Sequence, residues 1–191
     1  VLLSNPDGAM NQTGSGGLKS GVMTVSVGTS SALRMSVANA VLPEEPHTWC
    51  YLSPKGYLAG AAISGGCSSI EWFREKIAQN APYEQLECRE DVDTPVFLPF
   101  LYGERCPGEN EERSGGFYGL KPYHDRRSMY RAVQEGVLFN LRQGYEELCR
   151  ICGEPQGIRL SGGILHSPEW SQMCADIFER EISIEENPQC S

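Results

Sequence analysis

Basic residues are scarce in this sequence, and they are scattered. The 191 residues include 16 Lys and Arg against 25 Asp and Glu, which gives a formal net charge of −9 at pH 7. No run or stripe of basic side chains could follow a phosphate backbone. We therefore expect no nucleic acid partner.

Long apolar runs are also missing. A helix needs about 20 predominantly apolar residues to cross a bilayer, and no stretch of this sequence approaches that length. The first residues lack the basic segment and the apolar segment that are typical of a secretory signal. The sequence therefore predicts a cytoplasmic protein that does not bind a membrane.

Metal ligands at a recognisable spacing are absent from the sequence. His47, His124 and His166 lie far apart, and the single CxxC, from Cys149 to Cys152, has no second pair. Structural zinc sites use a closed set of such ligands at short spacings. The 8 cysteines lie mostly in apolar periodic segments, which indicates reduced, buried thiols rather than a disulfide scaffold. We expect no metal site formed by the chain itself.

The patterns that are present predict one α/β domain with a mixed sheet flanked by helices. The Val- and Thr-rich segment at residues 21–37, interrupted at Gly28, predicts two strands joined by a turn. Residues 48–64 predict a second pair, with SPKG as its turn. Apolar residues at the helical period predict helices near residues 68–80, 126–152 and 168–179. Pro and Gly interrupt residues 94–120, which predicts loops there.

The predicted helix at 126–152 is the longest regular element. Asp125 is suited to cap its first turn, and Gly153 follows its last residue. Gly136 and Gly144 lie inside it, although glycine weakens a helix. We expect these two glycines to mark close packing against a neighbouring element.

A pair of glycines, Gly162 and Gly163, precedes the last predicted helix. The segment GIRLSGGILHSPEW indicates a short strand, the glycine pair, and a helix with Ser167 as its cap and Pro168 in its first turn. At such a junction the backbone can approach a ligand closely, and helix N–H groups favour an anion. A plain turn is the alternative, because Gly-Gly before a helix is common in turns.

Further motifs accompany this junction. In VGTSSALRM, the residues Gly28, Thr29 and Ser30 form a turn whose N–H and hydroxyl groups could bind a phosphate. Asp7 precedes a Gly-rich run, and SGGFYGLKPYHDRRSMYRAVQEGVLFNL leads a Gly-rich turn into the long helix. Together with LPFLYGERCP and RLSGGILHSPEWSQMCADIF, in this order, they resemble the FGGY family of carbohydrate kinases over nearly the whole chain.

The resemblance implies a fold of the ribonuclease H-like, actin-like ATPase class, in which ATP and a sugar bind between two lobes. Residues 1–191 resemble part of the C-terminal, nucleotide-binding lobe. The phosphate hairpin and sugar-contacting residues that the family carries in its N-terminal lobe have no counterpart in the sequence. We therefore expect an excerpt of a longer protein, inactive as a kinase on its own. A homodimer is compatible with the resemblance.

The resemblance also implies roles for single residues. Asp7 corresponds to the general base that accepts the proton of the attacking hydroxyl. The implied nucleotide contacts are Gly28, Thr29 and Ser30 at the β- and γ-phosphates, Gly162 and Gly163 at the adenosine, Ser167 near the adenine or ribose, and Gly66 (or Cys67 in its place) in the pocket wall. ATP and Mg²⁺ are the implied cofactors. Glu104 and Arg105 match a further motif, with an exposed ion pair or a loop anchor as the alternative role.

The activity implied by the resemblance is phosphorylation of a hydroxyl on a sugar or sugar acid. DGAMNQTGSG, GTSSALR and RAVQEGVLFNL look more like the gluconate kinase branch than the glycerol kinase branch. Xylulose, or another pentulose, is the competing substrate. A non-catalytic nucleotide-binding module is the alternative of another class, and the Gly-aromatic-x-Gly-Leu motif argues against a structural actin-like protein.

Overall fold

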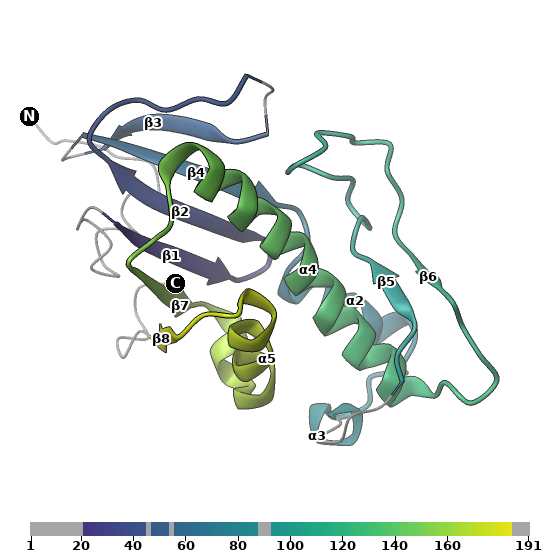
Figure 1. Ribbon diagram of the computed structural model, residues 1–191. Helices are drawn as coiled ribbons and strands as arrows, with labels where there is room; N and C mark the ends of the chain where they lie inside the picture. The colour runs from purple at the N-terminus through teal and green to yellow at the C-terminus, as the bar shows by residue number, and fades with distance from the viewer. Residues whose placement is uncertain (1–20, 45–46, 54–55, 88–92, 185–191) are drawn as a thin grey trace, which may run out of the picture.

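The protein is described by a computed structural model that places residues 21–44, 47–53, 56–87 and 93–184. A mixed six-stranded sheet forms one layer, and the long helix α4 (Arg126–Cys152) crosses one face of it (Figure 1). Among the placed residues, no helix is both long enough and apolar enough to cross a bilayer.

Both expected strand pairs are present in the sheet. Its strands are β1 (Val22–Val27), β2 (Ser31–Val37), β3 (Trp49–Ser53), β4 (Gly56–Ile63), β7 (Gly157–Ser161) and β8 (Ile182–Ile184). They lie in the order β3-β4-β2-β1-β7-β8. The first four strands pair antiparallel, whereas β7 joins β1 in parallel and β8 joins β7 in parallel. The sheet is therefore mixed, as expected.

The three expected helices are also present, with two differences in detail. They are α2 (Cys67–Lys76), α4 and α5 (Pro168–Phe178). The first ends before the expected limit of residue 80, because Gln79 and Asn80 adopt left-handed φ values of 53° and 59°. The glycine pair does not lead straight into α5. A short 3₁₀ turn, η1 (Gly163–His166), begins at the second glycine and precedes α5.

The segment at 94–120 is largely irregular, as predicted. It contains two short paired strands, β5 (Val96–Leu98) and β6 (Gly116–Tyr118), and the four-residue helix α3 (Tyr83–Leu86) lies before it. Between the strands, Arg113 Nη1 lies 2.6 Å from Glu104 Oε2, and the Glu104 side chain is 1% exposed. Glu104 is thus a loop anchor and not an exposed ion pair. Its partner, Arg113, had no role assigned from the sequence.

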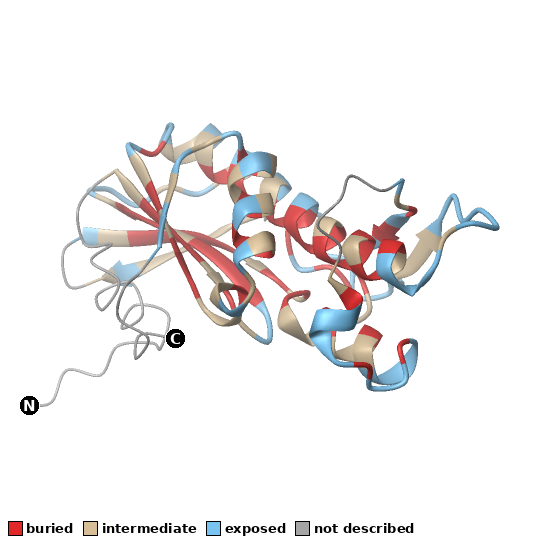
Figure 2. Cartoon of the chain, turned by 90° about the horizontal axis from the view of Figure 1, so that it is seen from below, coloured by how far each residue is buried: buried red, intermediate tan, exposed pale blue. Residues whose placement is uncertain are grey.

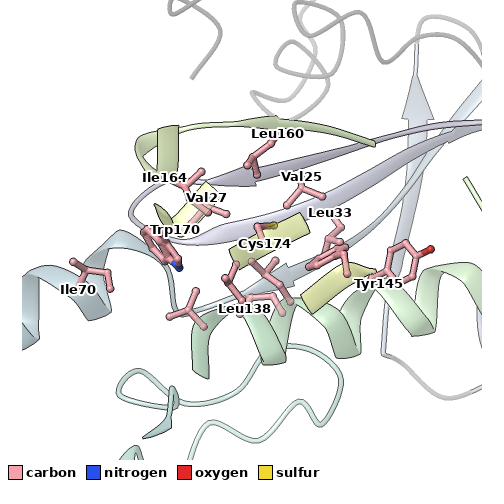
Figure 3. Close-up of a cluster of buried hydrophobic side chains, with 14 of the residues drawn as sticks. Val25, Val27, Leu33, Ile70, Leu138, Tyr145, Leu160, Ile164, Trp170 and Cys174 are labelled. Atoms are coloured by element: carbon pink, nitrogen blue, oxygen red, sulfur yellow. The ribbon is translucent and has the colours of Figure 1, made fainter. Parts of the chain in front are cut away.

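The core lies between the sheet and the helices. Met23, Val25 and Val27 alternate along β1 and are fully buried. Figure 3 shows Val25 and Val27 gathered with Leu138 of α4 and Cys174 of α5. Figure 2 shows that burial is concentrated along the sheet and on the helix sides turned toward it. The helical and alternating periods of the sequence therefore mark the faces that pack together.

Helix α4 has the cap and the close contacts expected of it. The Asp125 carboxylate accepts hydrogen bonds from the N–H groups of Arg127 and Ser128 at 2.9 and 3.0 Å. A Cβ on Gly136 would overlap the carbonyl oxygen of Phe97 in β5. Gly144 lies against β2 and β4, where a Cβ would be 3.1 Å from Leu33 Cδ1. The glycines let α4 approach strands of both sheets.

Removing the cap of α4 should cost about 1 kcal/mol of stability at neutral pH, as in Asp125→Ala. The N–H groups of Ser128 and Arg127 lower the pKa of the Asp125 carboxyl. The stabilisation is therefore present above the unfolded pKa of about 3.9 and is lost as the pH falls through the lower folded pKa. Urea unfolding at neutral and acidic pH measures this. Asp125→Asn is the control, because it keeps an acceptor and does not titrate. A wild-type advantage over Asp125→Ala that grew in acid would contradict the prediction.

Candidate functional site

The carboxyl ends of β1 and β7 lie at one edge of the sheet. The two strands pair in parallel, with Ser26 opposite Ser161. The turn at residues 28–30 follows β1, and Gly162 and Gly163 follow β7, so the structure brings these two predicted segments together. Ligands of α/β proteins commonly bind beyond the carboxyl ends of strands.

The start of helix α2 is the third part of this edge. The N–H groups of Cys67 and Ser68 donate to the carbonyls of Gly28 and Thr29 at 2.7 and 3.2 Å. A Cβ on Gly66 would lie 2.5 Å from the carbonyl oxygen of Gly28, so only glycine fits there. The first N–H groups of α2 are thus bound to the turn rather than directed at a ligand.

Gly162 and Gly163 close the same edge from the side of β7. Gly162 has a φ of 96°, and a Cβ there would lie 2.5 Å from Val27 O. A Cβ on Gly163 would lie 2.8 Å from Cys67 Sγ. Burial raises the pKa of the Cys67 thiol, whose Sγ donates to Val27 O at 3.5 Å. In this structure the two glycines therefore permit close packing within the protein: Gly162 packs against β1, and Gly163 packs against α2.

A cleft of about 920 Å³ opens beside the three segments. This volume is within the range of small-molecule sites. Its wall includes Thr29, Cys67, Ser68, Ile70, Glu71, Trp72, Glu75, Lys76, Tyr83, Glu84, Glu87, Tyr102, Tyr130, Gly163, His166, Ser167, Pro168, Glu169 and Trp170. The cleft thus joins α2, α3, η1 and the start of α5 to the turn after β1.

The predicted site residues divide into three groups. Thr29, Gly163 and Ser167 line the cleft. Of the two candidates for the pocket wall at the start of α2, Cys67 lines the cleft and Gly66 does not. The residues that support the wall from behind or beside it are Gly28, Ser30, Gly66 and Gly162. Asp7 lies outside the residues that the structure describes.

Four buried serine hydroxyls lie near the carboxyl ends of β1 and β7, and the sequence did not predict them. Within the described part of the chain, the Oγ atoms of Ser31, Ser68, Ser69 and Ser161 are buried without a hydrogen-bond partner. Ser31, Ser68 and Ser161 each border a segment already singled out, and Ser69 follows Ser68, which is the signal that could have revealed them. Buried polar atoms are rarely left unpaired. Of the four, only Ser68 also lines the cleft.

The cleft is strongly acidic on the side formed by α2, α3 and α5. Its carboxylates are Glu71, Glu75, Glu84, Glu87 and Glu169, against the single lysine Lys76. The Arg74 guanidinium, 2.6 Å from Glu71, and next the Tyr83 hydroxyl lower the pKa of the Glu71 carboxyl to about 2. This carboxylate is therefore ionised at neutral pH. Among the described residues, no group of three His, Cys, Asp or Glu side chains is arranged to hold a metal ion.

Comparison with known proteins identifies the family of this chain. The sequence model of the FGGY family of carbohydrate kinases, C-terminal domain, matches residues 23–191. The chain belongs to the FGGY family of carbohydrate kinases. The family resemblance of the sequence motifs is thereby confirmed.

Gluconokinases and xylulose kinases are among the curated relatives of this chain. The chain is 31% identical to the gluconokinase of Bacillus subtilis (strain 168), across 100% of the chain and 40% of that protein. It is 30% identical to the xylulose kinase of Escherichia coli (strain K12), across 95% of the chain and 39% of that protein. The chain thus spans about 40% of the length of the curated relatives it matches.

The fold agrees with solved FGGY structures. The crystal structure of ligand-bound xylulose kinase from Lactobacillus acidophilus has a TM-score of 0.80 and 30% identity, covering 99% of this chain and 40% of that one. The expected class, a mixed sheet flanked by helices in the actin-like ATPase fold, is confirmed by this match.

Proposed function

We propose that the full-length protein transfers a phosphoryl group from ATP to a hydroxyl of a sugar or sugar acid, and that this chain supplies the nucleotide cleft and the general base. One observation carries the proposal. In a chain of the FGGY family, the turn at residues 28–30, the start of α2 and the Gly162-Gly163 junction meet at a cleft large enough for a nucleotide.

The chemistry of the cleft wall fits a nucleotide. Thr29 lines the cleft beside the turn, and its hydroxyl can donate to a phosphate oxygen. Ser68 also lines the cleft, and its Oγ is buried without a described partner. Trp72, Tyr83 and Tyr130 add aromatic surface against which a base can pack. We assign the phosphates to the turn and the nucleoside to the aromatic part of the cleft.

Mg²⁺ is proposed to enter with the nucleotide. Mg²⁺ is commonly held by one or two carboxylates together with substrate phosphates and waters, so a protein site of three ligands is not required. When bound, the ion neutralises charge on the transferred phosphoryl group. Asp7, as the proposed general base, would accept the proton of the attacking hydroxyl. The resemblance also supports a cytoplasmic location and a homodimer as proposals.

Gluconate is the substrate that we propose first, supported by the similarity to gluconokinase and by the motif DGAMNQTGSG. Xylulose is the second candidate, because xylulose kinases match at nearly the same identity. ATP consumption by the full-length protein, measured with gluconate, xylulose, ribulose and glycerol, decides between them. We expect the highest kcat/KM with gluconate. ATP binding without consumption in the presence of any sugar would instead support a non-catalytic nucleotide-binding module.

A further inference from the structure

Glu87 has a position that the family comparison does not explain. It directly follows α3, and its N–H donates to Tyr83 O at 2.9 Å. Its side chain lies in the wall of the cleft, where Oε1 accepts a hydrogen bond from Ser167 Oγ at 3.2 Å. Ser167 Oγ also accepts from the N–H of Trp170 at 3.2 Å, as the cap of α5. Ser167, the N-cap of α5, thus links the Glu87 carboxylate to this helix by a hydrogen bond.

The charge of the cleft determines which end of a nucleotide Glu87 can meet. The wall on the side of Glu87 carries five carboxylates and one lysine. Negative groups close together repel each other, and more strongly so in a site partly shielded from water. A polyphosphate is therefore disfavoured beside Glu87. The uncharged nucleoside is favoured there, with the phosphates at Thr29.

A nucleoside offers what a carboxylate can bind. Carboxylate oxygens accept several hydrogen bonds, and a nucleoside carries donors on its ribose hydroxyls and on the amino group of adenine. Of the cleft carboxylates, Glu71 is engaged by Arg74 and Tyr83 at 2.6 and 2.7 Å. Glu87 accepts one described hydrogen bond, which leaves acceptor capacity toward a ligand.

We propose that Glu87 accepts a hydrogen bond from the nucleoside and so selects which nucleotide the cleft binds. This inference rests on the proposed kinase function. Ser167 is then a positioning residue, because its hydroxyl is committed to Glu87 and to the N–H of Trp170. The donor is a ribose hydroxyl or the adenine amino group, and nucleotide analogues distinguish the two.

Calorimetric titration of the full-length protein tests the inference. The ligands are ADP, 2′-deoxy-ADP, 3′-deoxy-ADP and inosine diphosphate, which lack a ribose hydroxyl or the adenine amino group in turn. For the wild type we expect one analogue to bind about tenfold more weakly than ADP, the loss typical of a hydrogen bond to a charged group. In Glu87→Ala this difference should vanish, because the acceptor is gone.

Glu84→Ala is the matched control, since it removes a carboxylate from the same cleft and from α3 itself. It should keep the difference between ADP and the analogue. Glu87→Gln is a second variant, which keeps one acceptor oxygen and should retain part of the difference. It carries the test if Glu87→Ala does not fold.

The outcomes separate this inference from the proposed function. A wild-type protein that does not bind ADP would overturn the nucleotide cleft itself. ADP binding with no penalty for any analogue would overturn only the role of Glu87. So would a penalty that keeps its full wild-type size in Glu87→Ala or, where that variant does not fold, in Glu87→Gln.

Discussion

Replacement of Asp7 by Asn in the full-length protein is expected to slow phosphoryl transfer by about 10²–10⁴-fold, the range typical of a positioned acid–base group. ATP and sugar affinities should stay nearly unchanged, because the amide keeps the size of the carboxylate and much of its hydrogen bonding. Single-turnover rates measure the chemical step, and calorimetric titration of each ligand measures binding.

Two controls define the meaning of the Asp7 result. Asp176→Asn makes the same chemical change at an exposed position in α5, where the carboxylate accepts from Gln172 at 2.8 Å, and should leave the rate unchanged. Melting temperatures of both variants show whether Asp7 is a structural turn residue, whose loss would lower stability and affinity together. An unslowed rate would remove Asp7 from the mechanism and favour the nucleotide-binding module.

Gly162→Ala is expected to destabilise the protein strongly. Its φ of 96° is strained for any residue with a Cβ, and the added carbon would lie 2.5 and 2.7 Å from the carbonyl oxygen and carbon of Val27. Backbone atoms of a central strand cannot move aside as a side chain can. We expect a loss of about 2–5 kcal/mol from strain and overpacking together. Urea unfolding of the wild type and the variant measures the loss.

Gly157→Ala, at the other end of β7, is the matched control for Gly162. No atom lies within 4 Å of a Cβ placed at Gly157, and its φ is not in the left-handed region. Its free energy of unfolding should change by no more than about 0.5 kcal/mol. Similar losses in the two variants would contradict the packing role assigned to Gly162.

The regular elements could be predicted from the sequence because their signals are local. Strand-forming residues interrupted by turn residues predicted the two hairpins of β1 to β4, and the apolar period with Asp125 and Gly153 located α4. The early end of α2 and the 3₁₀ turn η1 were missed. Asn80 and Pro82 indicated an end near residue 80, but Gln79, which is also left-handed, carries no such signal, so the last turn was placed too late. The 3₁₀ turn follows the glycine pair, which packs against β1.

The candidate site was only partly predictable, for a related physical reason. Glycines at turns and at strand-to-helix junctions can be recognised in the sequence, so Gly28, Gly162 and Gly163 could be proposed as site residues. What these glycines touch depends on contacts between distant segments, such as Gly163 against Cys67. The hydrogen bond from Ser167 to Glu87 joins residues that lie 80 positions apart, and no local pattern predicts it.

The most direct measurement is a crystal structure of the full-length protein with ADP. We predict that the nucleoside lies in the cleft between Gly163 and Glu87, with its diphosphate directed toward Thr29. Electron density for ADP elsewhere on the protein, or a diphosphate on the acidic side of the cleft, would contradict the assignment of this cleft as the nucleotide site.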